Sequence, residues 1–316
     1  MACPAIILIV ISPFDWSSPK ESILVSNELS VSEVEVVREE LSSVAPGSAL
    51  YKAAGDPVMY TYGFAPALVN SVLIPVSARG VAQHERLVDG RIPIVGIEHV
   101  MGRAIDSIDI IFGIVFAGHE AERAAHALHE LHRSVKGKMP DGSDYHAWNQ
   151  HIWTSTWLVQ VKGFMDAYGV LRGYDDEQHR LAVYRGFAEL GRHFHVTKMP
   201  TSLEEYDAYW KELTNTTLVA SEPARFLVEQ TTPKIVKPSK MQWIPTFLWA
   251  LLTLPGRRIA RVGLLITLPE KLDSELGIRR SWIDRVERKL HQCFWRLLPR
   301  SMTSKIGPAY FRLRCK

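Results

Sequence analysis

The side chains best suited to chemistry gather in one stretch of the chain, residues 98–137. Three histidines in its second half, His126, His129 and His132, recur at every third position, so on a helix neighbouring imidazoles lie near one another. Neutral imidazole is a frequent ligand of transition metals. The alternative is that His132 lies in the last turn of its helix and only caps it, which the helix dipole favours by itself. Spacing alone leaves both roles open.

The first half of the same stretch carries an arginine and a hydroxyl on one helix face. Arg103 and Ser107 are four residues apart, and the almost wholly apolar run Ile108–Ala117 follows them. A helix with so much apolar surface is expected inside the fold, where an arginine and a hydroxyl need polar partners. Arg103 could instead form an ordinary ion pair with Asp106, and a buried serine often bonds back to its own helix.

Two helices must position these side chains, and the sequence predicts that they meet at Gly118. The second helix is expected to begin with Glu120 and Glu122 and to close with Lys136 and Gly137. Acidic residues first, with a basic residue and glycine last, is the polarity that the helix dipole and a C-terminal cap favour. The histidines would then lie on a central helical hairpin.

The rest of the chain predicts more helices and few strands. Short buried helices are expected between residues 51 and 76, interrupted by Gly63, Pro66 and Pro75. Further helices are expected over residues 151–168, 175–191, 221–231, 243–254 and 283–298, with another that begins in a capping box of Ser202 and Glu205. Pro140, Asp141 and Gly142 predict a turn. The fold class is therefore all-α, a single mostly helical domain with a helical C-terminal extension.

Two other groups of residues invite a functional interpretation. His193 and His195 flank Phe194 in a spacing that suits a strand or a loop, and the sequence supplies no further ligand for a metal there, so surface positions are expected. The aromatic residues of the next group either wall an apolar pocket or belong to the core: Trp148, Trp153, Trp157, Phe164 and Tyr168.

Composition excludes several classes of protein. With 316 residues, of which 47% are hydrophobic, the chain can bury a large core. Its three cysteines are far apart, so a disulfide framework or a thiolate zinc site is not expected, and a reducing compartment such as the cytoplasm is favoured. No carboxylate side chain opposes the basic residues between Lys289 and Lys316, but no aromatic-basic motif accompanies them, so nucleic-acid binding is not expected.

Two apolar runs bear on membranes. The N-terminal run over residues 5–11 and the run Trp243–Leu254 are both too short to span a bilayer. We therefore expect a soluble protein, with a peripheral membrane contact through these runs or the basic tail left open. The sequence does not constrain the oligomeric state.

The motifs in the histidine-bearing stretch resemble a known family. Arg-x-x-x-Ser at 103–107, an apolar run ending in VFAGHEAE, then LHRSVKG and PDGSDYHA, resemble the catalytic domain shared by rubber oxygenases (latex clearing proteins) and fungal ER-bound oxygenases of mycophenolic-acid biosynthesis. The family's usual sequence is an arginine, three residues and a threonine, then a phenylalanine-glycine dipeptide and His-x-x-Val-x-Gly. Downstream segments, including LPEKLDSELGI and GPAYFRLR, extend the resemblance over residues 55–314.

The resemblance implies an all-helical fold, with globin-like packing around a pocket for one b-type haem, and oxidation with dioxygen. By position, His132 would be the axial ligand of the iron, with His129 as the fallback one turn earlier. Arg103 and Ser107 would line the distal side, the arginine anchoring a haem propionate or polarising oxygen. Residues 1–50 would be a variable N-terminal segment and 51–316 the catalytic domain.

Two departures from the family pattern concern this site. Ser107 stands where threonine is usual, which keeps the hydroxyl and loses a methyl group. The family's Trp-x-His element reads Trp153-Thr154-Ser155 here, and a histidine stands instead at His151. A role for a second histidine is therefore not carried over.

The resulting hypothesis is a haem-dependent oxygenase, cytoplasmic or associated with the ER membrane. Its substrates would be dioxygen and an apolar secondary metabolite, a polyketide or terpenoid, whose carbon-carbon double bond is cleaved or rearranged. The alternative is a cofactor-free helical binding or cyclase-type protein of a biosynthetic pathway. A third reading is a peripheral membrane interaction protein that uses the basic tail.

Overall fold

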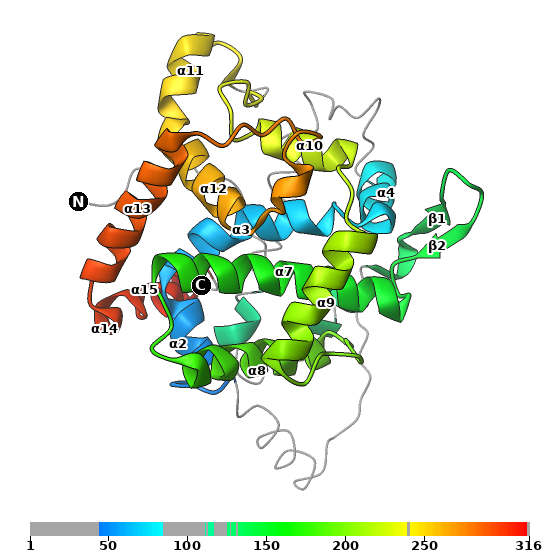
Figure 1. The fold of residues 1–316 in the computed structure, drawn as a ribbon, viewed down its shortest axis with the longest axis horizontal. Coiled ribbons are helices and arrows are strands. Elements are labelled where there is room, and N and C mark those ends of the chain that lie inside the picture. The colour runs from blue at the N-terminus through cyan, green and yellow to red at the C-terminus, as the bar shows by residue number, and fades with distance from the viewer. Residues whose placement is uncertain are drawn as a thin grey trace, which may run out of the picture.

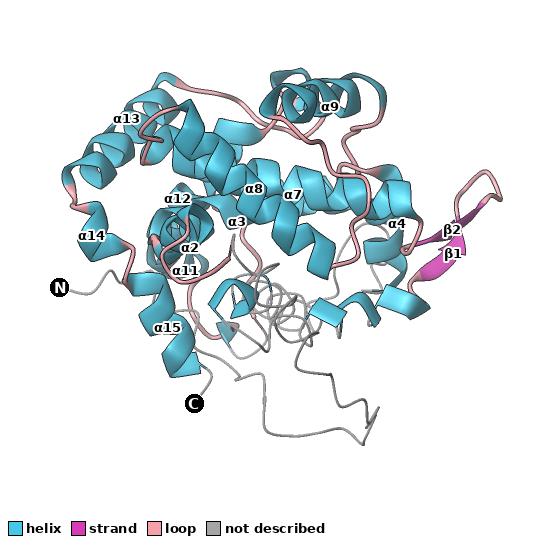
Figure 2. Cartoon of the chain, turned by 90° about the horizontal axis from the view of Figure 1, so that it is seen from below, coloured by secondary structure: helices cyan, strands magenta, loops and turns pink. Residues whose placement is uncertain are grey.

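The computed structural model describes residues 44–84, 111, 113–116, 125–126, 128–130, 132–238 and 241–314. Over these residues the chain is mostly helical (Figures 1 and 2), so the prediction of an all-α fold is confirmed for this part. The helices are α2 (Ala49–Gly55), α3 (Pro57–Ser71), α4 (Pro75–His84), η5 (His132–Ser134), α7 (Gln150–Leu171), α8 (Glu177–His193), α9 (Leu203–Thr216), α10 (Glu222–Glu229), α11 (Thr246–Leu252), α12 (Leu254–Thr267), η7 (Glu270–Leu272), α13 (Trp282–Leu297), α14 (Arg300–Thr303) and α15 (Ile306–Arg314).

The core is built where α3 packs alongside α7, in the middle of the molecule (Figure 1). Both helices carry a glycine where they meet, since a Cβ atom on Gly63 would lie 2.8 Å from the Cα atom of Phe164, and one on Gly163 would lie 2.7 Å from the amide nitrogen of Ala67. Glycine therefore serves here for close approach of two backbones, not for a turn. The predicted interruptions at Gly63 and Pro66 are wrong, because α3 runs through both residues, whereas the one at Pro75 is confirmed, because α4 begins there.

A side-chain cap starts one helix at the residue that the sequence predicted. The Ser202 hydroxyl accepts a hydrogen bond from the amide of Glu205 at 3.1 Å, which begins α9. The Glu205 carboxylate does not complete a reciprocal box with Ser202; it accepts hydrogen bonds from the amide and hydroxyl of Thr201, at 2.7 and 2.9 Å. The cap is thus extended by one residue upstream.

A small β-hairpin replaces the predicted end of the histidine-bearing helix. Strands β1 (Lys136–Lys138) and β2 (Asp144–His146) pair antiparallel, with Gly137 opposite Tyr145. Gly137 is therefore not a helix cap. A Cβ atom there would lie 3.0 Å from the Tyr145 ring, so the glycine makes room for that side chain. The turn predicted at 140–142 is confirmed, with Gly142 at a φ of +86°.

Helix α12 has no counterpart among the predicted helices, which leave a gap between 243–254 and 283–298. Pro255 directly follows the first of these ranges, yet it lies in the first turn of α12, where proline costs no hydrogen bond. α12 then packs on α3 through Gly263, whose missing Cβ atom leaves room for the carbonyl of Tyr62.

The C-terminal helices are joined to the core by a buried ion pair. Arg172 Nε, just after α7, donates to Asp56 Oδ2 at 2.8 Å, and both side chains are 2% exposed. The hydroxyl of Thr303 in α14 donates to the same carboxylate oxygen at 2.6 Å and accepts from Arg172 Nη2 at 2.7 Å. The basic tail is also partly engaged, since Arg300 donates to the carbonyl of Gly173 at 2.7 Å.

Among the described helices, none by itself is long and apolar enough to cross a bilayer. The pair α3 and α4, bent by 94° between them, meets the length and composition requirements when taken together.

Candidate functional site

The predicted site residues are only partly within the described structure. Arg103 and Ser107 lie outside the described residues, as does Asp106. His126, His129 and His132 are all described. The geometry that follows therefore concerns the histidine side of the predicted site.

His132 is the first residue of η5, and its ring is fixed by the turn before it. Its Nδ1 atom lies 2.8 Å from the carbonyl oxygen of Leu128. Because a carbonyl only accepts hydrogen bonds, Nδ1 carries the proton and Nε2 is the basic nitrogen of the neutral ring. The indole of Trp153 meets the imidazole edge-on, with ring centroids 5.1 Å apart and 70° between the planes. The tautomer and the orientation of His132 are thus both defined.

His129, one turn earlier, is held among aromatic rings. It stacks on Trp148 with centroids 4.4 Å apart and 5° between the planes, and Trp153 meets it edge-on at 5.5 Å. Trp148 Nε1 also donates to the backbone carbonyl of His129 at 2.8 Å. Burial lowers the pKa of His129, and the nearby imidazole of His195 lowers it further, against a smaller opposing effect of Glu130. His129 is therefore a neutral imidazole at neutral pH.

His195 joins this group through the end of α8. The amide of His195 donates to the carbonyl of Arg192 and the amide of Val196 to that of Gly191, both at 2.9 Å, which is the pattern of a Schellman motif. Such a motif needs one residue with left-handed backbone, and His195 takes it at a φ of 59°. Its ring then lies 4.5 Å from that of His129. The predicted surface position is confirmed for His195, whereas His193 is half-buried. The contact of His195 with His129 was not predicted.

The aromatic residues singled out from the sequence divide into two groups. Trp148 and Trp153 contact the histidines, whereas Trp157, Phe164 and Tyr168 are buried in the main core. The core reading holds for Trp157, Phe164 and Tyr168, and Trp153 also packs against that core; of the five, Trp148 alone lines the cavity described next.

A cavity of about 750 Å³ opens beside His129. Its walls mix imidazole, indole, amide and hydroxyl groups with apolar surface, from His129, Trp148, Gln150, Arg192, His195, Val196, Thr197, Met199 and Thr201. The guanidinium of Arg192 pairs with Glu189 on the same helix. A cavity of this size holds a small organic molecule, and its few polar groups can orient it.

The second histidine of the family pattern has no counterpart at its own position. Ser155 stands there, buried, and its hydroxyl donates to the carbonyl of His151 and contacts the hydroxyl of Tyr209, both at 2.7 Å. The side chain of His151 is exposed at the start of α7. In the described part of the chain, no group of three or more His, Cys, Asp or Glu residues is arranged to hold a metal ion.

Comparison with known families decides the classification. A family model described as the catalytic domain of ER-bound oxygenase mpaB/B' and rubber oxygenase matches residues 51–300. The chain belongs to this family. The resemblance seen in the sequence is confirmed, and the match includes the histidine group, the cavity walls, Arg103 and Ser107. As a member of a family of oxygenase catalytic domains, the protein is an oxygenase-type enzyme. No curated protein and no solved structure is significantly similar to the chain.

Proposed function

We propose that the protein is a haem-dependent oxygenase in which His132 is the axial ligand of the iron. The observation that carries this proposal is the hydrogen bond from His132 Nδ1 to the carbonyl of Leu128, at 2.8 Å. Histidines that ligate a metal usually donate their other ring nitrogen to a carbonyl or a carboxylate, which fixes the tautomer and makes the ligating nitrogen more basic. His132 has this arrangement within its own helical turn.

The residues present fit a b-type haem by the chemistry of their donors. A porphyrin supplies most of the ligands of its iron, so one imidazole with a defined tautomer meets the requirement on the protein. When bound, the haem supplies the iron chemistry by which dioxygen oxidises an organic substrate. His129 is the second candidate ligand, because its lowered pKa keeps its imidazole neutral at neutral pH. On the family resemblance, Arg103 and Ser107 would line the distal side, the arginine as a cation and the serine as a hydrogen-bond donor.

The cavity beside His129 supports an organic substrate of moderate size. Its volume, about 750 Å³, is in the range of small-molecule sites, and the Trp148 ring with Val196 and Met199 gives it apolar surface. We include in the proposal an apolar secondary metabolite, a polyketide or terpenoid, as the molecule oxidised. A location at the ER membrane is also part of the proposal, since the family's description names ER-bound oxygenases.

The visible spectrum of the protein, produced with a haem precursor supplied, tests the cofactor and its ligand together. The wild type is expected to show a Soret band that His132→Ala loses and His129→Ala keeps. His151→Ala is the matched control, because it removes an exposed imidazole from the start of α7. Far-ultraviolet circular dichroism of each variant shows that the helices remain.

The other outcomes are equally informative. Loss of the band in His129→Ala alone would keep the haem and move its ligand by one turn. A colourless wild type that takes up no added haemin would overturn the proposal and favour a cofactor-free protein that binds an apolar ligand in the cavity.

A further inference from the structure

A short helix at one end of the molecule presents apolar side chains to solvent. The segment 241–256, which contains α11, has no charged residue. Trp243, Phe247 and Leu251 are 78%, 76% and 61% exposed. Figure 1 shows α11 at the outer edge of the fold, beyond α12. Exposed apolar residues this dense are unusual on a soluble protein and mark a surface for a partner.

This segment is a well-supported helix and not a loose loop. Trp249, on the inner side of α11, is 6% exposed. The guanidinium of Arg257, which is also buried, donates to the carbonyl of Ala250 at 2.7 Å and to the hydroxyl of Thr253 at 3.2 Å. A cation at the C-terminus of a helix stabilises both the last carbonyls and the helix dipole. The apolar side chains are therefore held outward by the fold.

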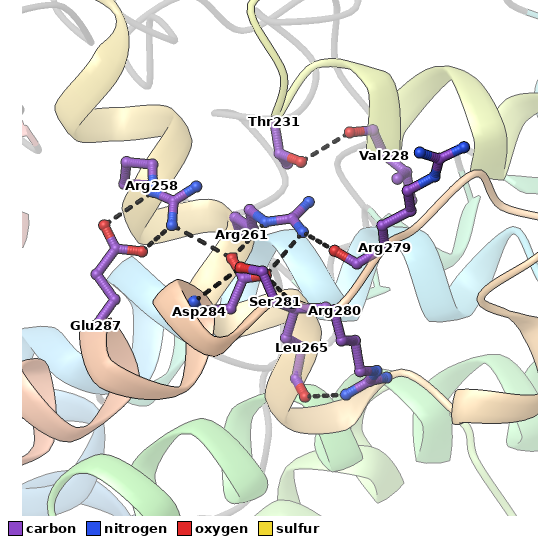
Figure 3. A network of polar contacts seen from close by, with 10 residues as sticks. All are labelled: Val228, Thr231, Arg258, Arg261, Leu265, Arg279, Arg280, Ser281, Asp284 and Glu287. Carbon is purple, nitrogen blue, oxygen red and sulfur yellow. Dashed lines mark hydrogen bonds and ion pairs between the residues drawn. The ribbon is translucent and has the colours of Figure 1, made fainter.

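The same end of the molecule contains α13, whose inner side is fixed by charge (Figure 3). Arg261 of α12 donates to Asp284 at 2.7 Å, and Arg258 donates to Glu287 at 2.8 Å. Asp284 also closes a capping box with Ser281. Partial burial by itself would raise the pKa of Asp284, but the hydrogen bonds from Arg261 and Ser281 outweigh it and hold that pKa well below its ordinary value. The polar side of α13 therefore faces α12.

The opposite side of α13 is an apolar stripe. Its members are separated by three or four positions, which places them on one helix face. They are all exposed: Ile283, Val286, Leu290, Phe294 and Leu297. Leu290 and Leu297 are 62% and 82% exposed, and Trp282 at the start of the helix is 67% exposed. Both ribbon views place α11 and α13 at the same end of the fold (Figures 1 and 2).

Basic side chains border the stripe along one edge. Arg285 and Lys289 are four residues apart, so they share a side of α13, and both are exposed. The two acidic residues of α13, Asp284 and Glu287, are both bound by arginines of α12. No carboxylate in the described structure pairs with Arg285 or Lys289. The outward side of α13 is thus apolar with a cationic margin.

We propose that the exposed sides of α11 and α13 form a docking surface for an anionic phospholipid bilayer, into one leaflet of which their apolar side chains insert. The cationic margin complements anionic headgroups, and exposed tryptophans such as Trp243 and Trp282 suit the boundary between headgroups and acyl chains. This inference does not depend on the haem or on the identity of the substrate. It assigns membrane contact to α11 and α13, so that of the basic tail Lys289 takes part, whereas Arg300 is bonded within the fold.

Vesicle flotation of the full-length protein tests the surface. The wild type is expected to float with phosphatidylcholine vesicles that contain phosphatidylserine. Phe247→Ser with Leu251→Ser, and separately Leu290→Gln with Phe294→Gln, should each weaken this binding by about tenfold or more, because each pair removes two side chains that insert. Val219→Ser is the matched control, since Val219 is 46% exposed and lies outside both helices.

Charge is tested separately. Arg285→Glu with Lys289→Glu should weaken binding to phosphatidylserine vesicles by about tenfold or more, and change binding to pure phosphatidylcholine little. Lys211→Glu, an exposed lysine of α9, is the matched control. Brominated lipids should quench the tryptophan fluorescence of the wild type. Trp243→Phe with Trp282→Phe should remove most of that quenching.

Three results would overturn the proposal. A wild type that does not float excludes a membrane partner. Wild type and variants that float equally would assign membrane binding to other residues, such as the apolar run at 5–11. A concentration-dependent dimer that Phe247→Ser with Leu251→Ser abolishes, without any vesicle binding, would assign the surface to a second copy of the chain.

Discussion

The imidazole of His129 lies parallel to the indole of Trp148, with ring centroids 4.4 Å apart and planes inclined by 5°. The same indole donates its N–H to the backbone carbonyl of His129 at 2.8 Å. Trp148 therefore holds both the side chain and the backbone of His129. The guanidinium of Arg133 lies 4.9 Å from the centre of that indole, which adds a cation–π contact. The connection between the hairpin and α7 is thus fixed to the histidine-bearing turn.

Replacing Trp148 separates the contribution of the ring stack on His129 from that of the indole hydrogen bond. Trp148→Leu should destabilise the protein by about 2–3 kcal/mol, because it removes the stack and the hydrogen bond. Trp148→Phe keeps a ring over His129 and should cost about 1 kcal/mol, mainly from the hydrogen bond. Urea unfolding followed by circular dichroism measures both free energies. Equal losses in the two variants would show that the stack contributes nothing.

The pKa of His129 should respond to His195. Burial is the larger cause of the lowered pKa of His129, and the neighbouring imidazole adds to it. His195→Gln should therefore raise the pKa of His129, while leaving it below the ordinary value because the burial remains. Titration of the histidine ring signals by NMR gives the shift. His179→Gln, which removes a histidine paired with Asp175, is the control and should leave the pKa of His129 unchanged.

The same lowered pKa makes stability depend on pH. Below about pH 6.5 the unfolded chain binds a proton at His129 while the folded protein still excludes it, so the free energy of unfolding falls as the pH drops through this window. The loss is complete once the pH lies below the folded pKa. His129→Gln should show a smaller fall than the wild type between pH 7.5 and pH 5. An equal fall in the free energy of unfolding for the wild type and His129→Gln, measured by thermal or urea unfolding, would contradict the assignment of this pH dependence to His129. The comparison with the variant is needed because His291 also has a pKa lowered by burial.

The left-handed backbone at His195 predicts an order of stability among its variants. His195→Gly and His195→Ala both remove the imidazole, but only alanine keeps a Cβ atom at a φ of 59°. The glycine variant should be the more stable by about 1 kcal/mol, since a Cβ atom in this conformation costs that much. Urea midpoints of the two variants give the difference. A more stable alanine variant would mean that the Schellman motif does not form in solution.

The buried pair of Asp56 and Arg172 should behave as a unit. Asp56→Asn and Arg172→Met each leave an unpaired polar group at a site that is 2% exposed, so each should cost about 3 kcal/mol. The double variant should cost clearly less than the sum of the two, since neither charge then remains buried alone. A double-mutant cycle in guanidinium chloride measures the coupling. Additive losses would exclude a direct interaction.

Much of the helical framework could be predicted from the sequence, because caps and apolar periodicity are local signals. The helix expected over 151–168 is observed as α7, and Ser202 starts α9 as predicted. Two boundaries differ from the prediction. The helix predicted over 175–191 continues to His193 as α8, because Gly191 serves packing: a Cβ atom there would lie 2.7 Å from Trp157 Nε1. Pro255, which directly follows the helix predicted over 243–254, lies in the first turn of α12.

The site could be predicted less completely than the framework. The spacing of the histidines indicated His129 and His132, and both lie together with Trp148 and Trp153. His195 could not be predicted, because it reaches His129 only through a left-handed residue that sequence patterns usually assign to glycine. The outward direction of the apolar stripe on α13 also escaped prediction, since it depends on which side the arginines of α12 bind.

The bond from Thr303 to Asp56 has a practical consequence for the limits of the folding unit. The family match ends at residue 300, yet Thr303 donates to the buried carboxylate of Asp56 at 2.6 Å. Gly307 of α15 packs so closely on α2 that a Cβ atom there would lie 2.9 Å from the carbonyl oxygen of Ala54. A recombinant fragment trimmed to residues 51–300 would lack these contacts of Thr303 and Gly307. It would expose the ion pair of Asp56 and Arg172 to water. Boundaries for expression and crystallisation should therefore extend past α15.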